Sequence, residues 1–168
     1  MELRAELLPP RLDEALVHRL AHLADALDGA APEQCEEDLA EFNRLAGTAL
    51  AFADFQGIYG GEEHETWVRR IVRSKMLRPV ADVTREELAE VVRRAMPQNE
   101  DPDYEAYMAI FDANVPRPHA SNLIFYSADY NHNRDWQSEY DPTPEEIVDQ
   151  ALSYKVVALP PPRPQGSA

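Results

Sequence analysis

The sequence predicts an all-α fold, and three observations lead to this expectation. Apolar residues recur at intervals of three and four, which is the spacing of a helix that buries one face. Signals for helix starts and helix ends are frequent, whereas strand-like segments are scarce. Hydrophobic residues make up 44% of the 168 residues, enough to build a core. The chain therefore suits one compact domain, or one small domain with a sizeable extension.

The first half of the chain, residues 1–78, is expected to be an N-terminal helical extension. Leucines at helical spacing predict a helix over residues 11–27, which Gly29 ends. Pro32 suits the first turn of a second helix, which runs to Gly47.

A third helix of this extension is expected after the two glycines at positions 60–61. A short segment over residues 52–59 precedes this turn. Two acidic residues at the start of the third helix and three arginines towards its end have the signs that the helix dipole favours. The sequence Leu77-Arg78-Pro79 breaks the helical pattern, and we place the main boundary there.

The second half, residues 79–158, is expected to hold three further helices and one short helical turn. Thr84 and Glu87 form a capping box that opens the first of these helices. The second helix is expected to start at Asp101 as the N-cap residue, with Pro102 at the first helical position.

The remaining segments of this half are shorter. Residues 121–126 are expected to make about one helical turn, and a polar loop follows over residues 129–141. A capping box of Thr143 and Glu146 opens the last helix. Residues 159–168 form a proline-rich tail that is expected to be disordered.

The chain is strongly acidic, with 31 acidic and 16 basic residues and a net charge of −15. Such a surface repels nucleic acid and anionic lipid, and it attracts basic proteins. Plain solubility is the alternative explanation of this charge. The sequence shows no signal peptide and no apolar run that approaches about 20 residues, so a soluble, cytoplasmic protein without membrane contact is expected.

The sequence offers only weak candidates for a chemical site, and we expect no catalytic residue, no metal and no cofactor. His64-Glu65 lacks the second histidine of an HExxH zinc motif, and His18 and His22 share a helix face without a third ligand nearby. The loop Asp129–Asp135 places oxygen ligands at alternate positions, but it lacks the glycine and the final glutamate of a calcium loop. A plain polar loop is the favoured interpretation, and ion binding is the alternative. The single cysteine, Cys35, is expected to have no chemical role.

Residues 83–155 carry a specific order of motifs. The segment DVTREELAEVVRRAM is followed by an acidic helix, by RPHASNLIFYS and by DPTPEEIVDQALSYK. This order resembles the immunity proteins that bacteria make against nuclease colicins and S-type pyocins. The third segment is the most specific, because the family has a Ser-Asp-Leu-Ile-Tyr-Tyr-Pro signature there. The resemblance implies a four-helix unit whose third helix is short, packed with the N-terminal extension.

The resemblance also implies where a partner binds. Family members bind their toxin through the second helix, which sets specificity, and through the third, which supplies a common anchor. Ser121 and Tyr126 match signature residues, Phe125 keeps a tyrosine ring without its hydroxyl, and Asn122 replaces an aspartate. Burial in an ordinary core is the alternative role of the two aromatic rings. The toxin-binding residues expected from this comparison are Asp101, Asp103, Tyr104, Glu105, Met108, Asp112, Ser121, Asn122, Phe125 and Tyr126.

The first functional hypothesis is an immunity protein, not an enzyme. It would bind and neutralise the cytotoxic domain, most simply a nuclease, of a cognate bacteriocin or polymorphic toxin. The alternative is a non-enzymatic structural or regulatory module that keeps the immunity fold without a toxin partner. A third hypothesis, a metal-dependent enzyme, rests only on the loop at residues 129–135. The expected partner is a basic toxin domain, neither nucleic acid nor membrane, and the chain is expected to be a monomer or a weak dimer.

Overall fold

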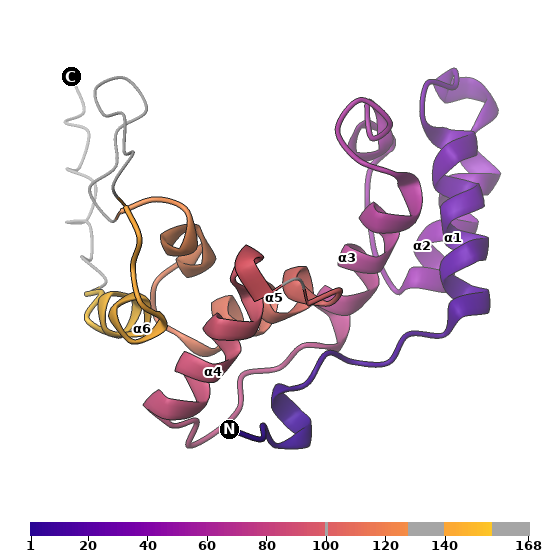
Figure 1. Ribbon diagram of the computed structural model, residues 1–168. Helices are drawn as coiled ribbons and strands as arrows, with labels where there is room; N and C mark the ends of the chain where they lie inside the picture. Colours follow the sequence, from indigo (N-terminus) through magenta and orange to yellow (C-terminus); the bar gives the residue numbers. More distant parts are fainter. Residues whose placement is uncertain (100, 128–139, 156–168) are drawn as a thin grey trace, which may run out of the picture.

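The computed structural model describes residues 1–99, 101–127 and 140–155, and these residues contain helices and no strand (Figure 1). The predicted all-α fold is therefore confirmed. The α-helices are α1 (Glu14–Leu27), α2 (Glu36–Ala46), α3 (His64–Met76), α4 (Arg85–Ala95), α5 (Tyr104–Asn114) and α6 (Pro144–Leu152). The 3-10 helices are η1 (Ala5–Leu7), η2 (Pro32–Gln34), η3 (Phe52–Phe55), η4 (Pro97–Asn99) and η5 (Ala120–Ile124). No helix in the described ranges is long and apolar enough to cross a membrane.

The α-helices form two groups, and each group has its own core (Figure 1). In the first group, α1, α2 and α3 pack around the rings of Phe42, Phe55 and Trp67, whose centroids lie 4.8 to 5.8 Å apart. We call this group, residues 14–76, the α1–α3 module. In the second group, α4, α5, η5 and α6 bury a separate apolar cluster. We call this second group the α4–α6 unit.

The first eight residues pack with the second group, although they precede the first group in the sequence. Leu3 and Leu7 are buried among the core residues of α4, α5 and α6. The terminal ammonium group of Met1 lies 3.5 Å from the carboxylate of Glu90 on α4. We call residues 1–8 the N-terminal arm. The α1–α3 module thus lies, along the chain, between two segments of one core.

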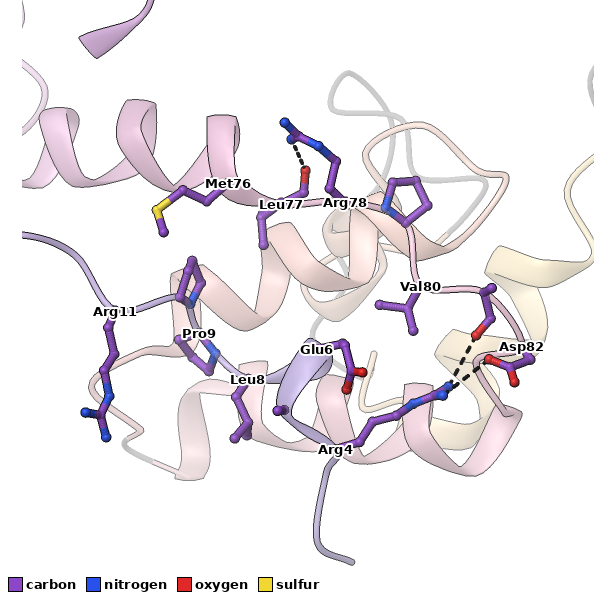
Figure 2. Close-up of a pocket in the computed structure, with 14 residues that line it drawn as sticks. Arg4, Glu6, Leu8, Pro9, Arg11, Met76, Leu77, Arg78, Val80 and Asp82 are labelled. Carbon is purple, nitrogen blue, oxygen red and sulfur yellow. Dashed lines mark hydrogen bonds and ion pairs between the residues drawn. The ribbon is translucent and has the colours of Figure 1, made fainter. Parts of the chain in front are cut away.

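The two connections to the α1–α3 module run past each other. Residues 8–11 lead to the module and residues 76–82 return from it, and together they line a hollow of about 740 Å³ (Figure 2). Arg4 of the arm reaches the returning segment, where it donates to the carboxylate of Asp82 at 3.2 Å and to the carbonyl of Ala81 at 3.5 Å. The predicted limit at residue 78 remains a prediction, and the contacts of the arm favour counting residues 1–8 with the second unit.

Two helix starts in the α1–α3 module lie later than predicted. Helix α1 begins at Glu14 because the carboxylate of Asp13 accepts hydrogen bonds from two backbone N–H groups of the first turn. Pro32 belongs to η2, and α2 begins only at Glu36. The predicted end of α2 is confirmed, since Gly47 adopts the left-handed conformation at φ +64° that a C-terminal glycine permits.

In the α4–α6 unit, both predicted capping boxes are confirmed. Thr84 and Glu87 cap α4, and Thr143 and Glu146 cap α6 in the same way. The predicted N-cap at Asp101 is wrong by two positions, because α5 begins at Tyr104. The carboxylate of Asp101 instead accepts the N–H of Asp103 at 2.9 Å, which closes a turn before the helix.

Candidate functional site

The short helix η5 presents two aromatic side chains at the surface. Leu123 and Ile124 are buried in the core, whereas Phe125 and Tyr126 are 43% and 41% exposed. Their ring centroids lie 6.3 Å apart. The carbonyl of Asn122 accepts the N–H of Phe125 at 3.0 Å and that of Tyr126 at 2.9 Å, so a tight turn sets the direction of both residues. The two rings are therefore surface features and not core residues.

Two hydrogen-bonded contacts hold η5 in place, one from α5 and one from Tyr140, which precedes α6. The carboxylate of Asp112 on α5 accepts the N–H of Ser121 at 2.7 Å and its hydroxyl at 2.8 Å. The hydroxyl of Tyr140 donates to the carbonyl of Leu123 at 2.6 Å. Burial raises the pKa of Tyr140, which keeps this hydroxyl protonated and able to donate. Asp112 and Ser121, both expected to bind a toxin, thus orient the aromatic pair.

The start of α5 contributes a third exposed aromatic residue next to η5. Tyr104 is 39% exposed and lines a hollow of about 460 Å³ together with Phe125 and Asp101. Pro97 and Pro102 complete this hollow, and their only signal in the sequence was their place at helix boundaries. The structure thus brings together residues of α5 and η5 that the resemblance had implied separately.

The hydroxyl of Tyr104 is a hydrogen-bond donor in this surface. It donates to the carboxylate of Glu105 at 3.2 Å, and the negative charge of that carboxylate raises the pKa of Tyr104. A tyrosine that stays neutral presents an aromatic face and a polar edge, which suits it to a protein interface.

The carboxylates of α5 differ in how they are used. Asp103 forms an ion pair with Arg73 of α3, with 2.7 Å between Asp103 Oδ1 and Arg73 Nη2, so part of its charge is balanced within the chain. Glu105 lines a second hollow beside α3, and Met108 lines it as well. Residues 80–156 carry 16 acidic and 6 basic side chains, a net charge of −10, so the negative charge is concentrated in this part of the chain.

The other candidate sites form no metal centre among the described residues. His18 and His22 are both exposed on α1, as a surface pair would be. His64 contacts the carboxylate of Asp28 through Nε2 at 3.0 Å. Cys35 is buried and its thiol donates to a backbone carbonyl at 3.2 Å. The loop suggested for calcium, residues 129–135, lies outside the described residues.

Of the comparisons with known proteins, one found a match, and that match is to a family model. No curated protein and no solved structure matched the chain. The family model described as "Colicin immunity protein / pyocin immunity protein" matches residues 80–156. This match covers α4, α5, η5 and α6, and it leaves out the N-terminal arm and the α1–α3 module. Residues 80–156 therefore match the colicin and pyocin immunity family, which confirms the resemblance seen in the sequence and supports an immunity role.

Proposed function

We propose that the protein neutralises the cytotoxic domain of a cognate bacteriocin or polymorphic toxin by binding it in a one-to-one complex. The toxin domain is basic, and a nuclease is the class that fits best. The binding surface consists of the start of α5 and the aromatic end of η5. Inhibition comes from charge and bulk beside the toxin's active site, so this chain contributes no catalytic residue and no cofactor.

The observation that carries the proposal is the exposed aromatic pair on η5. Phe125 and Tyr126 are held at the surface by a tight turn, while the two residues before them anchor η5 in the core. Rigidly presented aromatic residues bury much area at little cost in conformational entropy, and such residues dominate binding energy at protein interfaces. A soluble protein gains nothing in stability by exposing two neighbouring rings, so their exposure supports a binding role.

The charge of residues 80–156 supports a basic partner. A nuclease exposes lysine and arginine to hold phosphates, and a surface with a net charge of −10 attracts it and speeds the encounter. The exposed rings then supply the short-range contacts that make the complex long-lived. Charge thus accounts for the rate of binding and the rings for its duration.

One observation favours the alternative, a structural module without a toxin partner. Asp103 and Asp112 are engaged with Arg73 and Ser121 of the same chain, which reduces the acidic surface that α5 offers to a partner. A module that had lost its toxin partner would keep such internal contacts, because they stabilise the fold. Evolution would no longer select for the exposed rings, because they would bind nothing. The experiment below separates the two functions.

The test is a pull-down with the tagged chain from its native cell lysate, at low salt and at about 0.5 M salt. At the higher concentration the Debye length falls to roughly 4 Å, so partners held only by long-range charge are washed away. We expect a basic toxin domain to remain bound, and we expect the purified chain to block the toxicity of that domain at a one-to-one ratio. Recovery of only mixed, salt-labile basic proteins would contradict the proposal and favour the alternative.

A pair of tyrosine variants makes this test specific. Tyr126→Ala should lose the toxin at high salt, because it removes one of the two rings of the proposed anchor. Tyr59→Ala is the matched control, since Tyr59 is 77% exposed but lies in the α1–α3 module. Equal retention by both variants would show that the toxin binds elsewhere.

A further inference from the structure

A hollow lies where the α1–α3 module meets the α4–α6 unit. Its α3 side lies outside the residues that match the family model, and its α5 side lies within them. It has a volume of about 210 Å³ and is lined by residues of α3 and α5 alone. Helix α5 also carries Glu105 and Asp112 of the residues expected to bind a toxin. The hollow therefore continues the proposed toxin-binding surface towards the module.

The floor of the hollow is apolar. Ala106 is buried, and Met108 and Ala109 are partly exposed beside it. Because two of these three residues are alanines, the helix surface is indented rather than filled by its own side chains. A cavity of roughly 150 Å³ already holds a benzene ring, so the space suffices for one large apolar side chain of a partner.

The walls of the hollow carry charges that leave it acidic. Arg70 and Arg73 form the α3 wall, but each is paired within the chain, Arg70 with Glu62 and Arg73 with Asp103. Their positive charges are thus balanced and do not repel a basic partner. The α5 wall includes Glu105, and this side of the hollow adjoins the acidic start of α5. An apolar pocket with such a rim complements an apolar side chain that is flanked by lysine or arginine.

We propose that this hollow is a specificity pocket, in which α3 and α5 together receive one bulky apolar side chain of the bound toxin domain. The inference rests on the proposed function, and it adds that the α1–α3 module takes part in choosing the toxin. A toxin that docks on the aromatic end of η5 but carries a charged or small residue at this point binds more weakly, because the pocket stays empty or receives a charge.

Cysteine protection tests the occupancy of the pocket in the full-length chain. The native Cys35 is 3% exposed, so a cysteine introduced at the surface is the thiol that reacts first. Ala109→Cys places a thiol in the pocket, and Lys75→Cys places one on an exposed part of α3 outside it. The probe is the toxin domain retained at 0.5 M salt, with its active site inactivated, and the readout is the rate of reaction with Ellman's reagent.

We expect bound toxin to slow the labelling of Ala109→Cys at least tenfold and to change that of Lys75→Cys less than twofold. A filled pocket should also weaken binding, so Ala109→Phe should raise the dissociation constant at least tenfold. Arg70→Ala, which removes one of the two side chains on the α3 wall, should raise it by about threefold. A melting curve checks that each variant folds, and the labelling result stands even where Ala109→Phe does not fold.

The outcomes separate this inference from the proposed function. If Tyr126→Ala weakens toxin binding as expected but Ala109→Cys labels equally fast with and without toxin, the pocket is not part of the interface and the proposed function stands. If the chain retains no toxin at high salt, the proposed function fails and the specificity pocket fails with it.

Discussion

Replacing Leu7 by alanine should destabilise the α4–α6 unit by about 2–4 kcal/mol. The side chain is fully buried among residues of that unit's core. Leucine to alanine removes about three methylene equivalents, which at roughly 0.8 kcal/mol each gives about 2.4 kcal/mol before any cavity is counted. Core substitutions of this kind cost up to about 5 kcal/mol, but a terminal arm can shift to close the gap, so we expect the lower part of the range.

The adjacent residue provides the control for this prediction. Leu8 is 39% exposed, and Leu8→Ala should cost less than about 1 kcal/mol. Hydrogen exchange followed by mass spectrometry is the suitable assay, because it reports on α1, α4 and α6 separately in the intact chain. Leu7→Ala should accelerate exchange in α4 and α6 by at least tenfold and leave α1 nearly unchanged.

Two results would refute the assignment of the N-terminal arm to the second core. Equal effects of Leu7→Ala and Leu8→Ala would mean that the arm contributes no specific packing. Equal acceleration in α1 and α4 would mean that the whole chain unfolds as one unit, so that the two cores are not separable.

The remaining predictions concern the interface, the module and the junction between the units. Tyr126→Ala should raise the dissociation constant of the toxin complex about 30-fold, equivalent to about 2 kcal/mol, by isothermal titration calorimetry. The hydrogen bonds that the carboxylate of Asp28 accepts from the N–H groups of Tyr59 and Gly57 help to lower its pKa below the ordinary value of 3.8. The ionised carboxylate therefore stabilises the module above about pH 4, and this contribution should fade as the pH falls through the lowered pKa. Urea unfolding between pH 3 and 6 should therefore show a weaker pH dependence of stability for Asp28→Asn than for the wild type. Arg73→Ala should loosen the junction without unfolding either unit, seen as a larger radius of gyration in X-ray scattering at an unchanged melting temperature.

Local signals explain why much of the fold could be predicted from the sequence. A capping box links residues three positions apart, so Thr84 with Glu87 and Thr143 with Glu146 could be recognised without any tertiary structure. The start of α5 was misplaced because Asp101-Pro102 has the chemistry of a cap, whereas the chain uses Asp101 to close a preceding turn. A helix N-cap and such a turn begin with the same residue types, and only the backbone conformation distinguishes them.

Long-range contacts explain what the sequence did not reveal. The arm is too short for a periodic pattern, so nothing local separates buried Leu7 from exposed Leu8. The partner of Asp103 lies 30 residues away, on a helix outside the family match, and its pairing with Arg73 depends on the packing of α3 beside α5. The exposure of Phe125 could likewise not be predicted from composition and spacing, because both allowed a buried ring as readily as an exposed one.

The position of the α1–α3 module follows from the way it joins the chain. Arg4 of the arm binds Ala81 and Asp82 of the returning connection, and the two connections line one hollow (Figure 2). The module therefore occupies the interval between the arm and α4 without separating two parts of one core. Joining a module through two neighbouring points costs little closure entropy and leaves its orientation to be set by further contacts. Those contacts place α3 beside α5 and include the ion pair of Arg73 with Asp103, while the aromatic end of η5 stays exposed. The module is thus held against α5, the helix expected to set specificity, and away from the aromatic anchor on η5. It is therefore suited to alter which toxin is bound without disturbing the anchor.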